Sequence, residues 1–336
     1  MLLTIFPDRI TRRNEPFPVR RGGRLRVGHK AVRLARWFIL ALAPALVLAL
    51  LGPPGQAHAA SGRITLESGG IARNAILVQN RRLKQARRPL VIVLRSSREK
   101  GPHLKRVFGL EEMEGSGGPV LVYPEPVGGH WSDAPGPEAA RDAAFIRDLI
   151  GKLVSDGLVD RRKVFIIGIS NGGFTALRTV CDNAALFAGA AALITALPAD
   201  LADSCKLARP VPFMMIAGTA DPYVPYAGGK VNLPDSKISV LSADATLAVF
   251  ARAAGCAEGR STTPMPDRDT RDGTRDYLDK LNGCKVPVEI LRVAGGGHSA
   301  PGHLAGVGAD TTRGGPHNND IESARLIWDF FRKLGG

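Results

Sequence analysis

The sequence predicts an α/β fold, with a mostly parallel central sheet and helices on both of its faces. Short apolar runs bounded by turn residues alternate along the chain with longer segments in which apolar residues recur every three to four positions. One run, residues 164–169, is apolar throughout, as in strands that are buried on both faces of a parallel sheet. Strands that alternate with helices pair in parallel, because each crossover helix returns the chain to the same end of the sheet.

The predicted elements follow one another in a regular order. Two leading strands, near 64–66 and 75–78, are joined by a Gly-Gly turn, and residues 81–88 form a basic, solvated connection. Residues 257–283 are charged and poor in apolar residues, which predicts a surface excursion. Further strands are predicted at 89–94, 118–124, 164–169, 188–195, 210–217 and 286–293, and helices at 138–156, 171–184, from about 242, and at 322–334.

The first 59 residues are predicted to be a signal peptide. Basic residues precede an apolar run at 37–51, which is shorter than the ~20 residues of a membrane span. Ala57-His58-Ala59 then supplies a small-residue cleavage site. We therefore expect a single mature domain at 60–336, secreted or periplasmic, with no stable membrane anchor after cleavage. An uncleaved N-terminal anchor is the alternative.

The charge of the chain is weak evidence for a nucleic-acid partner. More than half of the net charge of +14 lies within residues 1–59, so the high isoelectric point belongs mainly to the predicted signal peptide. No basic patch is interleaved with aromatic residues in the remainder. Nucleic-acid binding is therefore not expected.

All four cysteines lie in the predicted mature domain. An even number of cysteines in an exported chain predicts two disulfides, and three pairings are possible. We favour the pairing that is local in sequence, Cys181–Cys205 and Cys256–Cys284, because each bond closes one excursion between core elements. No Cys-x-x-Cys spacing occurs, so a zinc site is not indicated.

A glycine-rich turn follows the buried run at 164–169. Gly168-Ile169-Ser170-Asn171-Gly172 fits the pattern Gly-x-Ser-x-Gly, and residues 174–178 favour a helix. A sharp strand-to-helix turn of this kind is the nucleophile elbow of α/β-hydrolases. It would lift the Ser170 hydroxyl out of the sheet and place the Asn171 amide where it can donate to a developing oxyanion. An ordinary turn or an N-cap serine is the alternative.

Two later loops supply the partners that a serine nucleophile requires. Asp221 follows the predicted strand at 210–217, and His298 follows three glycines after the strand at 286–293. The order Ser, Asp, His at the carboxyl ends of strands is that of α/β-hydrolases. The base accepts the serine proton and the acid orients the base. The alternatives are a turn residue at Asp221, a surface histidine at His298, and rival bases at His303 and His317.

Several motifs of this chain occur together in one protein family. They lie at 168–173, 218–226, 295–302 and 327–331, together with the Gly-Cys pairs that end at Cys256 and Cys284. In these motifs the chain resembles the secreted poly(3-hydroxybutyrate) depolymerase and feruloyl esterase family of α/β-hydrolases, over nearly all of residues 60–336. The resemblance implies Ser170 as nucleophile, Asp221 as acid and His298 as base. It also implies a one-domain esterase without a metal or an organic cofactor.

The chain departs from this family at two places. Arg95-Ser96 stands where the family usually has His-Gly, so the second oxyanion donor would be the backbone of Ser96 or Ser97, with the Arg95 cation near the pocket. Ala300 stands where the family usually has Trp, which would open one wall of the substrate pocket. Trp131 resembles the family's Gly-x-Trp and is expected either to line the site or to pack in the core.

We expect an exported serine esterase that acts through an acyl-enzyme. Its expected substrates are small or oligomeric esters, such as hydroxyalkanoate oligomers or feruloyl and acetyl esters. No appended substrate-binding domain is recognised, which disfavours dense polymer granules. A peptidase of the same fold would need a cap or propeller domain, for which no segment is long enough. A catalytically silent binding protein is the alternative from another class, and the altered Arg95-Ser96 loop motivates it.

Overall fold

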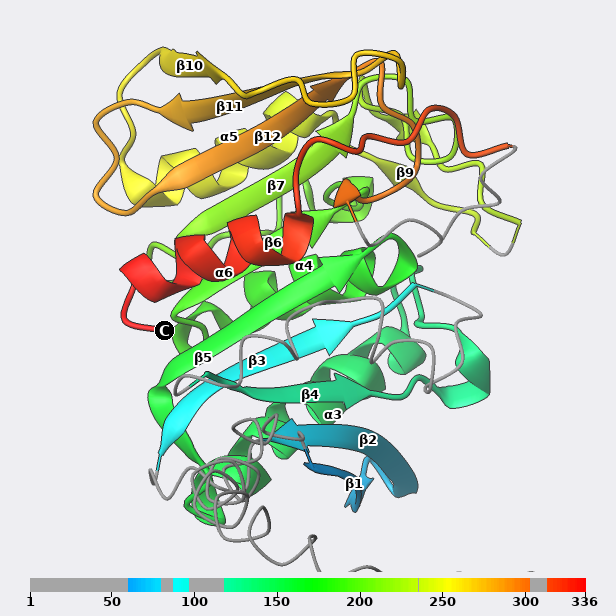
Figure 1. The fold of residues 1–336 in the computed structure, drawn as a ribbon. Helices are drawn as coiled ribbons and strands as arrows, with labels where there is room; N and C mark the ends of the chain where they lie inside the picture. Colours follow the sequence, from blue (N-terminus) through cyan, green and yellow to red (C-terminus); the bar gives the residue numbers. More distant parts are fainter. Residues whose placement is uncertain (1–59, 80–86, 97–117, 235, 303–312) are drawn as a thin grey trace, which may run out of the picture. The chain divides into compact units, whose positions relative to one another are not determined.

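A computed structural model describes residues 60–79, 87–96, 118–234, 236–302 and 313–336 of the chain (Figure 1). The predicted signal peptide, Ser97 and His303 lie outside these ranges. None of the helices in the described ranges combines the length and apolar character that crossing a membrane would require.

The described residues form a ten-stranded sheet in the order β1-β2-β4-β3-β5-β6-β7-β12-β11-β10. The six strands from β4 to β12 pair in parallel, and antiparallel strands flank them at both ends. A separate two-stranded ribbon joins β8 to β9. The strands are β1 (Ala60–Ser68), β2 (Ile71–Gln79), β3 (Arg88–Leu94), β4 (Val120–Pro124), β5 (Val159–Ile169), β6 (Gly189–Leu193), β7 (Phe213–Gly218), β8 (Gly229–Lys230), β9 (Ser239–Val240), β10 (Arg260–Pro264), β11 (Arg275–Leu281) and β12 (Val288–Ala294).

Helices cover both faces of the sheet and create two hydrophobic clusters. Alternate residues of β5 show the division, because Val164 and Ile166 join one cluster whereas Phe165 and Ile167 join the other. The helix α6 covers the second face, where Phe331 stacks on Phe165 with ring centroids 4.5 Å apart (Figure 1). The helices are α3 (Pro137–Ser155), α4 (Asn171–Asn183), α5 (Ala243–Ala254) and α6 (Ser323–Lys333); buried residues of α3, α4 and α5 belong to the first cluster.

The predicted fold class is confirmed, and two local predictions are wrong. The excursion at 257–283 contains β10 and β11, which extend the sheet beyond β12. Every residue of β10 is exposed, so this edge strand needs no apolar alternation and gives no hydrophobic signal. Arg88, expected in a solvated loop, begins β3 and is buried, with its guanidinium donating to Gln79 Oε1.

The two disulfides of the structure are Cys181–Cys205 and Cys256–Cys284, the pairing favoured from the sequence. Cys181 lies in α4, and Cys256 follows directly after the left-handed cap residue Gly255 of α5. Each bond therefore ties a core helix to a connecting segment.

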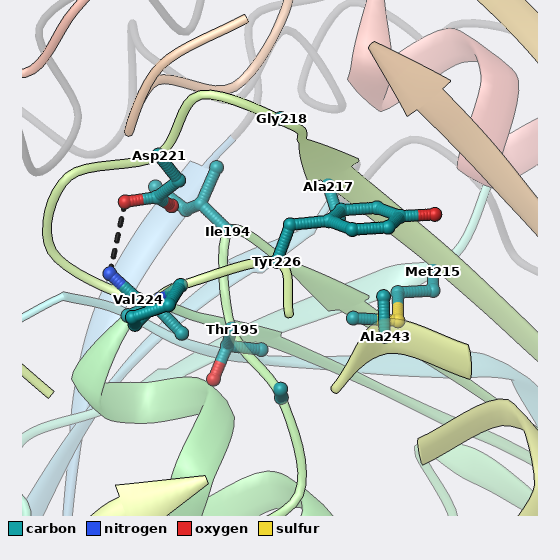
Figure 2. A pocket seen from close by; sticks show the side chains of 11 residues that line it. Ile194, Thr195, Met215, Ala217, Gly218, Asp221, Val224, Tyr226 and Ala243 are labelled. Atoms are coloured by element: carbon teal, nitrogen blue, oxygen red, sulfur yellow. Dashed lines mark hydrogen bonds between the residues drawn. The ribbon is translucent and has the colours of Figure 1, made fainter. Parts of the chain in front are cut away.

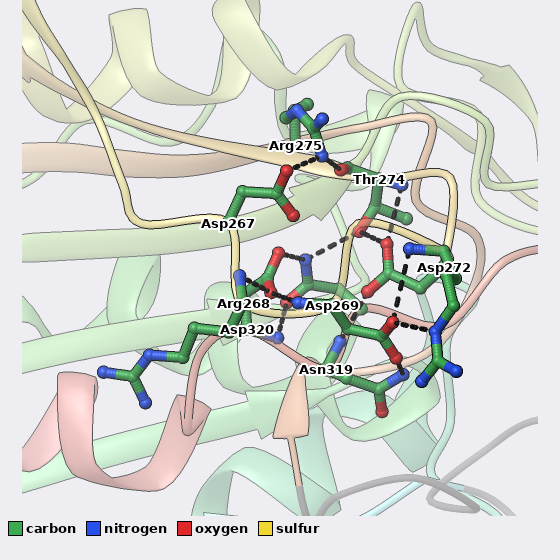
Figure 3. Close-up of polar contacts among 10 residues, drawn as sticks. Asp267, Arg268, Asp269, Asp272, Thr274, Arg275, Asn319 and Asp320 are labelled. Carbon is green, nitrogen blue, oxygen red and sulfur yellow. Dashed lines mark hydrogen bonds and ion pairs between the residues drawn. The ribbon is translucent and has the colours of Figure 1, made fainter.

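A network of acidic side chains joins the turn before β11 to the segment before α6 (Figure 3). Asp320 Oδ1 accepts from the backbone N–H groups of Arg268, at 2.6 Å, and Asp269, at 2.8 Å. Asp272 Oδ2 accepts from the N–H of Asn319 at 3.0 Å. These carboxylates accept hydrogen bonds from backbone N–H groups in irregular segments. They therefore hold the turn before β11 against the segment before α6.

Asp276 of β11 lies beside this network. Its side chain is buried, and neither carboxylate oxygen is exposed to water. Burial raises the pKa of Asp276 to about 6; the nearby Asn318 amide opposes the rise, and the carboxylates of Asp320, Asp272 and Asp267 add to it. The folded protein therefore binds this proton more tightly than the unfolded chain does.

Asp276→Asn is expected to stabilise the protein at neutral pH but not at acid pH. A raised folded-state pKa costs stability as pH rises from the unfolded value towards 6, and the cost is constant above it. The stabilisation at pH 7.5 should exceed that at pH 4.5 by about 2 kcal/mol, measured by urea unfolding with the disulfides intact. The exposed Asp182→Asn is the control and should show no such difference. Equal stabilisation by Asp276→Asn at both pH values would contradict the assignment.

Candidate active site

Ser170 occupies a strained turn between β5 and α4. Its backbone has φ 50° and ψ −121°, a conformation that residues other than glycine rarely adopt. The turn can form because the neighbouring glycines have no side chain: a Cβ at Gly168 would lie 2.5 Å from Ala176 Cβ, and one at Gly172 would lie 2.3 Å from the carbonyl oxygens of Leu94 and Arg95. The elbow therefore packs directly against the end of β3.

Gly172→Ala is expected to destabilise the protein by about 1–3 kcal/mol, as other overpacked cores are destabilised. The new methyl group meets backbone carbonyl oxygens, which cannot rotate away as a side chain would. Gly151→Ala is the matched control, because Gly151 lies in α3 with nothing within 4 Å of the place its methyl group would take, and alanine favours a helix by roughly 0.5–1 kcal/mol. Urea midpoints that shift alike in both variants would refute the close approach.

The predicted site residues Ser170, His298 and Asp221 lie in one chain of hydrogen bonds. Ser170 Oγ is 2.9 Å from His298 Nε2, and His298 Nδ1 is 2.7 Å from Asp221 Oδ2. The other carboxylate oxygen of Asp221 accepts from the backbone N–H groups of Tyr223 and Val224. All three side chains are buried, with Ser170 at 1% and His298 at 0% exposure. The imidazole thus has one nitrogen on the hydroxyl and one on the carboxylate.

The loops that carry Asp221 and His298 are joined through their backbones. Thr219 N donates to Val293 O at 2.9 Å, and Ala220 N donates to Gly296 O at 2.9 Å. A Cβ at Gly218 would lie 2.3 Å from Gly296 O, so the absence of a side chain at Gly218 permits this contact. Parallel pairing of β7 with β12 brings the two loops to the same edge of the sheet.

A small pocket lies behind the Asp221 turn (Figure 2). Figure 2 shows the Asp221 carboxylate turned to the N–H of Val224, with Thr195, Met215 and Tyr226 around the pocket. Thr195 is buried, and its hydroxyl has no hydrogen-bond partner in the described part of the chain. The pocket therefore lies directly beside the acid.

The predicted rival His317 has a different position. Its Nδ1 is 3.0 Å from Ser299 Oγ, and its Nε2 is 3.1 Å from Gly302 O. His317 therefore braces the loop that follows His298 and does not contact Ser170.

The predicted oxyanion donors lie where the elbow meets β3. Asn171 is the first residue of α4, so its backbone N–H has no partner within the helix. Ser96 is buried just beyond the end of β3, next to the carbonyl oxygen of Arg95 that approaches Gly172. Arg95 is buried too, and its Nη1 donates to Ser96 O at 3.1 Å. The guanidinium therefore braces this turn.

The other two predicted pocket residues are placed in the core. Trp131 is fully buried and belongs to the first hydrophobic cluster. Of the two positions expected for this ring, the structure shows packing in the core. Ala300 is fully buried in the second cluster, together with α6 residues such as Ile327.

Sequence reasoning missed the side chain of Asn171. Its Oδ1 accepts from Trp131 N at 2.9 Å, and its Nδ2 donates to Trp131 O at 3.0 Å. Nδ2 also lies 3.3 Å from His130 Nε2. No local pattern predicts a contact between segments forty residues apart.

Tyr223 was also missed, and its ring packs edge-on against His298 with centroids 5.3 Å apart.

Among the described residues, no group of three or more His, Cys, Asp or Glu side chains is arranged to hold a metal ion.

The chain matches known proteins in sequence. Residues 137–246 match the family described as phospholipase/carboxylesterase. A putative esterase, NocK, of Nocardia uniformis subsp. tsuyamanensis is 31% identical over 232 residues, which is 64% of this chain and 66% of that protein. Feruloyl esterase B of Piromyces equi is 29% identical over 52% of this chain and 32% of its own length. The chain thus spans just under two thirds of the first relative and about one third of the second.

The fold also matches a solved structure. The acetyl xylan esterase from Aspergillus awamori has a TM-score of 0.52 over 71% of this chain and 94% of its own, at 13% identity, so it supports the fold alone. The strand order, the family match and the esterase relatives agree with one another, while the poly(3-hydroxybutyrate) part of the resemblance stays a prediction. The chain therefore has the α/β-hydrolase fold and is similar in sequence to phospholipase/carboxylesterase proteins and to named esterases.

Proposed function

We propose that this protein is a serine esterase that hydrolyses carboxylic esters through Ser170, His298 and Asp221. The observation that carries the proposal is the buried hydrogen-bond chain from Ser170 Oγ through His298 to Asp221 Oδ2. A serine hydroxyl is a weak nucleophile, and an imidazole held by a carboxylate is the base that activates it.

In the proposed reaction Ser170 Oγ attacks the ester carbonyl carbon while His298 Nε2 takes the hydroxyl proton. The tetrahedral oxyanion accepts hydrogen bonds from the backbone N–H groups of Asn171 and Ser96. It collapses as the alkoxide leaves with the proton from His298, which forms the acyl-enzyme. Water then gives its proton to His298, attacks the acyl carbon and releases the acid, and Ser170 regains its proton.

The proposed substrates are small or oligomeric esters. Relatives named feruloyl esterase favour feruloyl esters, and the sequence resemblance adds acetyl esters and hydroxyalkanoate oligomers. The buried Arg95-Ser96 turn in place of His-Gly is the feature that favours a silent binding protein instead.

A fluorophosphonate probe distinguishes these two functions. We expect it to label residues 60–336 of the wild type and to leave Ser170→Ala unlabelled. Hydrolysis of p-nitrophenyl butyrate, methyl ferulate and a hydroxybutyrate trimer would then rank the substrates. A folded wild type that takes up no probe would favour the silent binding protein.

We also propose that the protein is exported, secreted or periplasmic, after cleavage behind Ala59. Its two disulfides are typical of oxidising compartments, and the basic and apolar pattern of residues 1–59 fits a signal peptide. Amino-terminal sequencing of the mature protein should begin at Ala60, and an intact Met1 in the exported fraction would contradict the cleavage.

A further inference from the structure

His130 contacts the residue that follows the predicted nucleophile, and it has no role in the reaction described so far. It precedes Trp131 in the loop after β4, and its Nε2 is 3.3 Å from Nδ2 of Asn171, the residue that follows Ser170. A short 3-10 turn, Val127–Gly129, leads into it, with Gly128 and Gly129 at positive φ. The loop is thus shaped so that His130 reaches the elbow.

The hydrogen bonds of Asn171 define the tautomer of His130. Asn171 Oδ1 is the acceptor for Trp131 N, so the amide orientation is fixed. One N–H of Nδ2 donates to Trp131 O, and the second points to His130 Nε2. Nε2 must therefore accept, and the proton of a neutral His130 is on Nδ1.

That Nδ1–H donor is buried and has no hydrogen-bond partner among the described residues. A buried donor without a partner costs about 1–3 kcal/mol, and native proteins retain few of them. A donor on a side chain that contacts the residue after a reactive serine can instead be satisfied by the molecule on which the serine acts.

The loop is held so that His130 keeps this position. Ser132 N donates to Asp142 Oδ2 at 3.0 Å, one residue beyond the peptide that Asn171 holds. Asp142 Oδ1 is paired with Arg73 at 2.8 Å, and both of these side chains are buried. Residues 131 and 132 are therefore fixed from two helices, α4 and α3, which restrains His130 directly before them.

We propose that His130 is a specificity residue, which donates its Nδ1–H to an oxygen of the substrate beyond the scissile ester group. The substrates it would favour are esters that carry a hydroxyl, phenol or ether oxygen, and Asn171 is the positioning residue that sets the tautomer. This inference rests on the proposed esterase function and narrows its substrate class.

Two variants of His130 separate its two nitrogens. In His130→Gln the amide lies as many bonds from Cα as Nε2 does, so the variant keeps a group for Asn171 and loses the Nδ1 donor. In His130→Asn the amide lies as many bonds from Cα as Nδ1 does, so the variant keeps a donor there and loses the contact with Asn171.

The readout is the ratio of kcat/KM for two pairs of esters that differ only in the extra oxygen. The pairs are methyl ferulate with methyl cinnamate, and ethyl 3-hydroxybutyrate with ethyl butyrate. We expect the wild type to prefer the oxygenated member of at least one pair. His130→Gln should reduce that ratio about tenfold, the value of one hydrogen bond, and His130→Asn should retain more of it.

The other outcomes overturn the inference. If His130→Gln lowers kcat/KM by the same factor for both members of each pair, the residue is only structural. A loosened loop would affect both esters equally, whether or not they carry the extra oxygen. An unchanged ratio, or a wild type with no preference, overturns it as well. A folded wild type that takes up no fluorophosphonate and hydrolyses none of the four esters would instead show that the proposed esterase function itself is wrong.

Discussion

Ser170→Ala is expected to lower kcat for p-nitrophenyl butyrate by about 10⁶-fold, the scale of losing the nucleophile of a serine hydrolase. Without Oγ no acyl-enzyme can form, and His298 has no hydroxyl to deprotonate. The residual rate would come from the oxyanion donors acting on direct attack by water. Because Ser170 is held at φ 50°, alanine at this position should relieve none of the backbone strain and leave the fold intact.

The measurement is the initial rate of the purified variant, with circular dichroism to check the fold. Ser155→Ala, at the exposed end of α3, is the matched control and should retain the wild-type rate. A loss of less than 10²-fold for a folded Ser170→Ala would point to a different nucleophile, contrary to the hydrogen bond between Ser170 and His298.

Asp221→Asn is expected to lower kcat by about 10⁴-fold, because it should impose the wrong tautomer on His298. The N–H groups of Tyr223 and Val224 both donate to Asp221 Oδ1, so the amide oxygen of asparagine must occupy that place. Its NH₂ group then faces His298 Nδ1 and donates to it. The imidazole proton moves to Nε2, which can no longer accept from Ser170 Oγ.

Steady-state kinetics at neutral pH test this explanation. We expect Asp221→Asn to bind substrate with a KM close to the wild-type value, while kcat remains low at neutral pH. Asp182→Asn, on the exposed surface of α4, is the control and should leave kcat unchanged. A folded Asp221→Asn with more than a tenth of the wild-type kcat would show that the carboxylate does not orient His298.

The sequence allows prediction of the parts of this molecule whose signals are local. The buried run 164–169 and the glycines around Ser170 predict the elbow, because both features act within a few residues. Asp221 and His298 follow from the position of strand ends, which apolar runs mark. Ser242 likewise caps α5 through a hydrogen bond from Ala245 N to its hydroxyl.

The features that escaped prediction depend on long-range contacts or on exposed strands. β10 and β11 form by backbone pairing at the edge of the sheet, and their polar side chains give no period-two pattern. Trp131 could be read equally well as a pocket residue or as core, since only the packed chain shows what surrounds the ring. The Asn171 contacts join segments forty residues apart, so no window along the chain contains both partners.

The pairing of β12 with β7 also determines when the site can form. His298 is 128 residues from Ser170 and 77 from Asp221, and it reaches them only after β12 joins the sheet beside β7. Contacts between such distant residues close large loops, and the entropic cost of closing them slows folding. Recovery of ester hydrolysis during refolding would therefore time the docking of the last strand, whereas recovery of helical signal would time earlier events. Activity therefore reports whether β12 has joined the sheet beside β7.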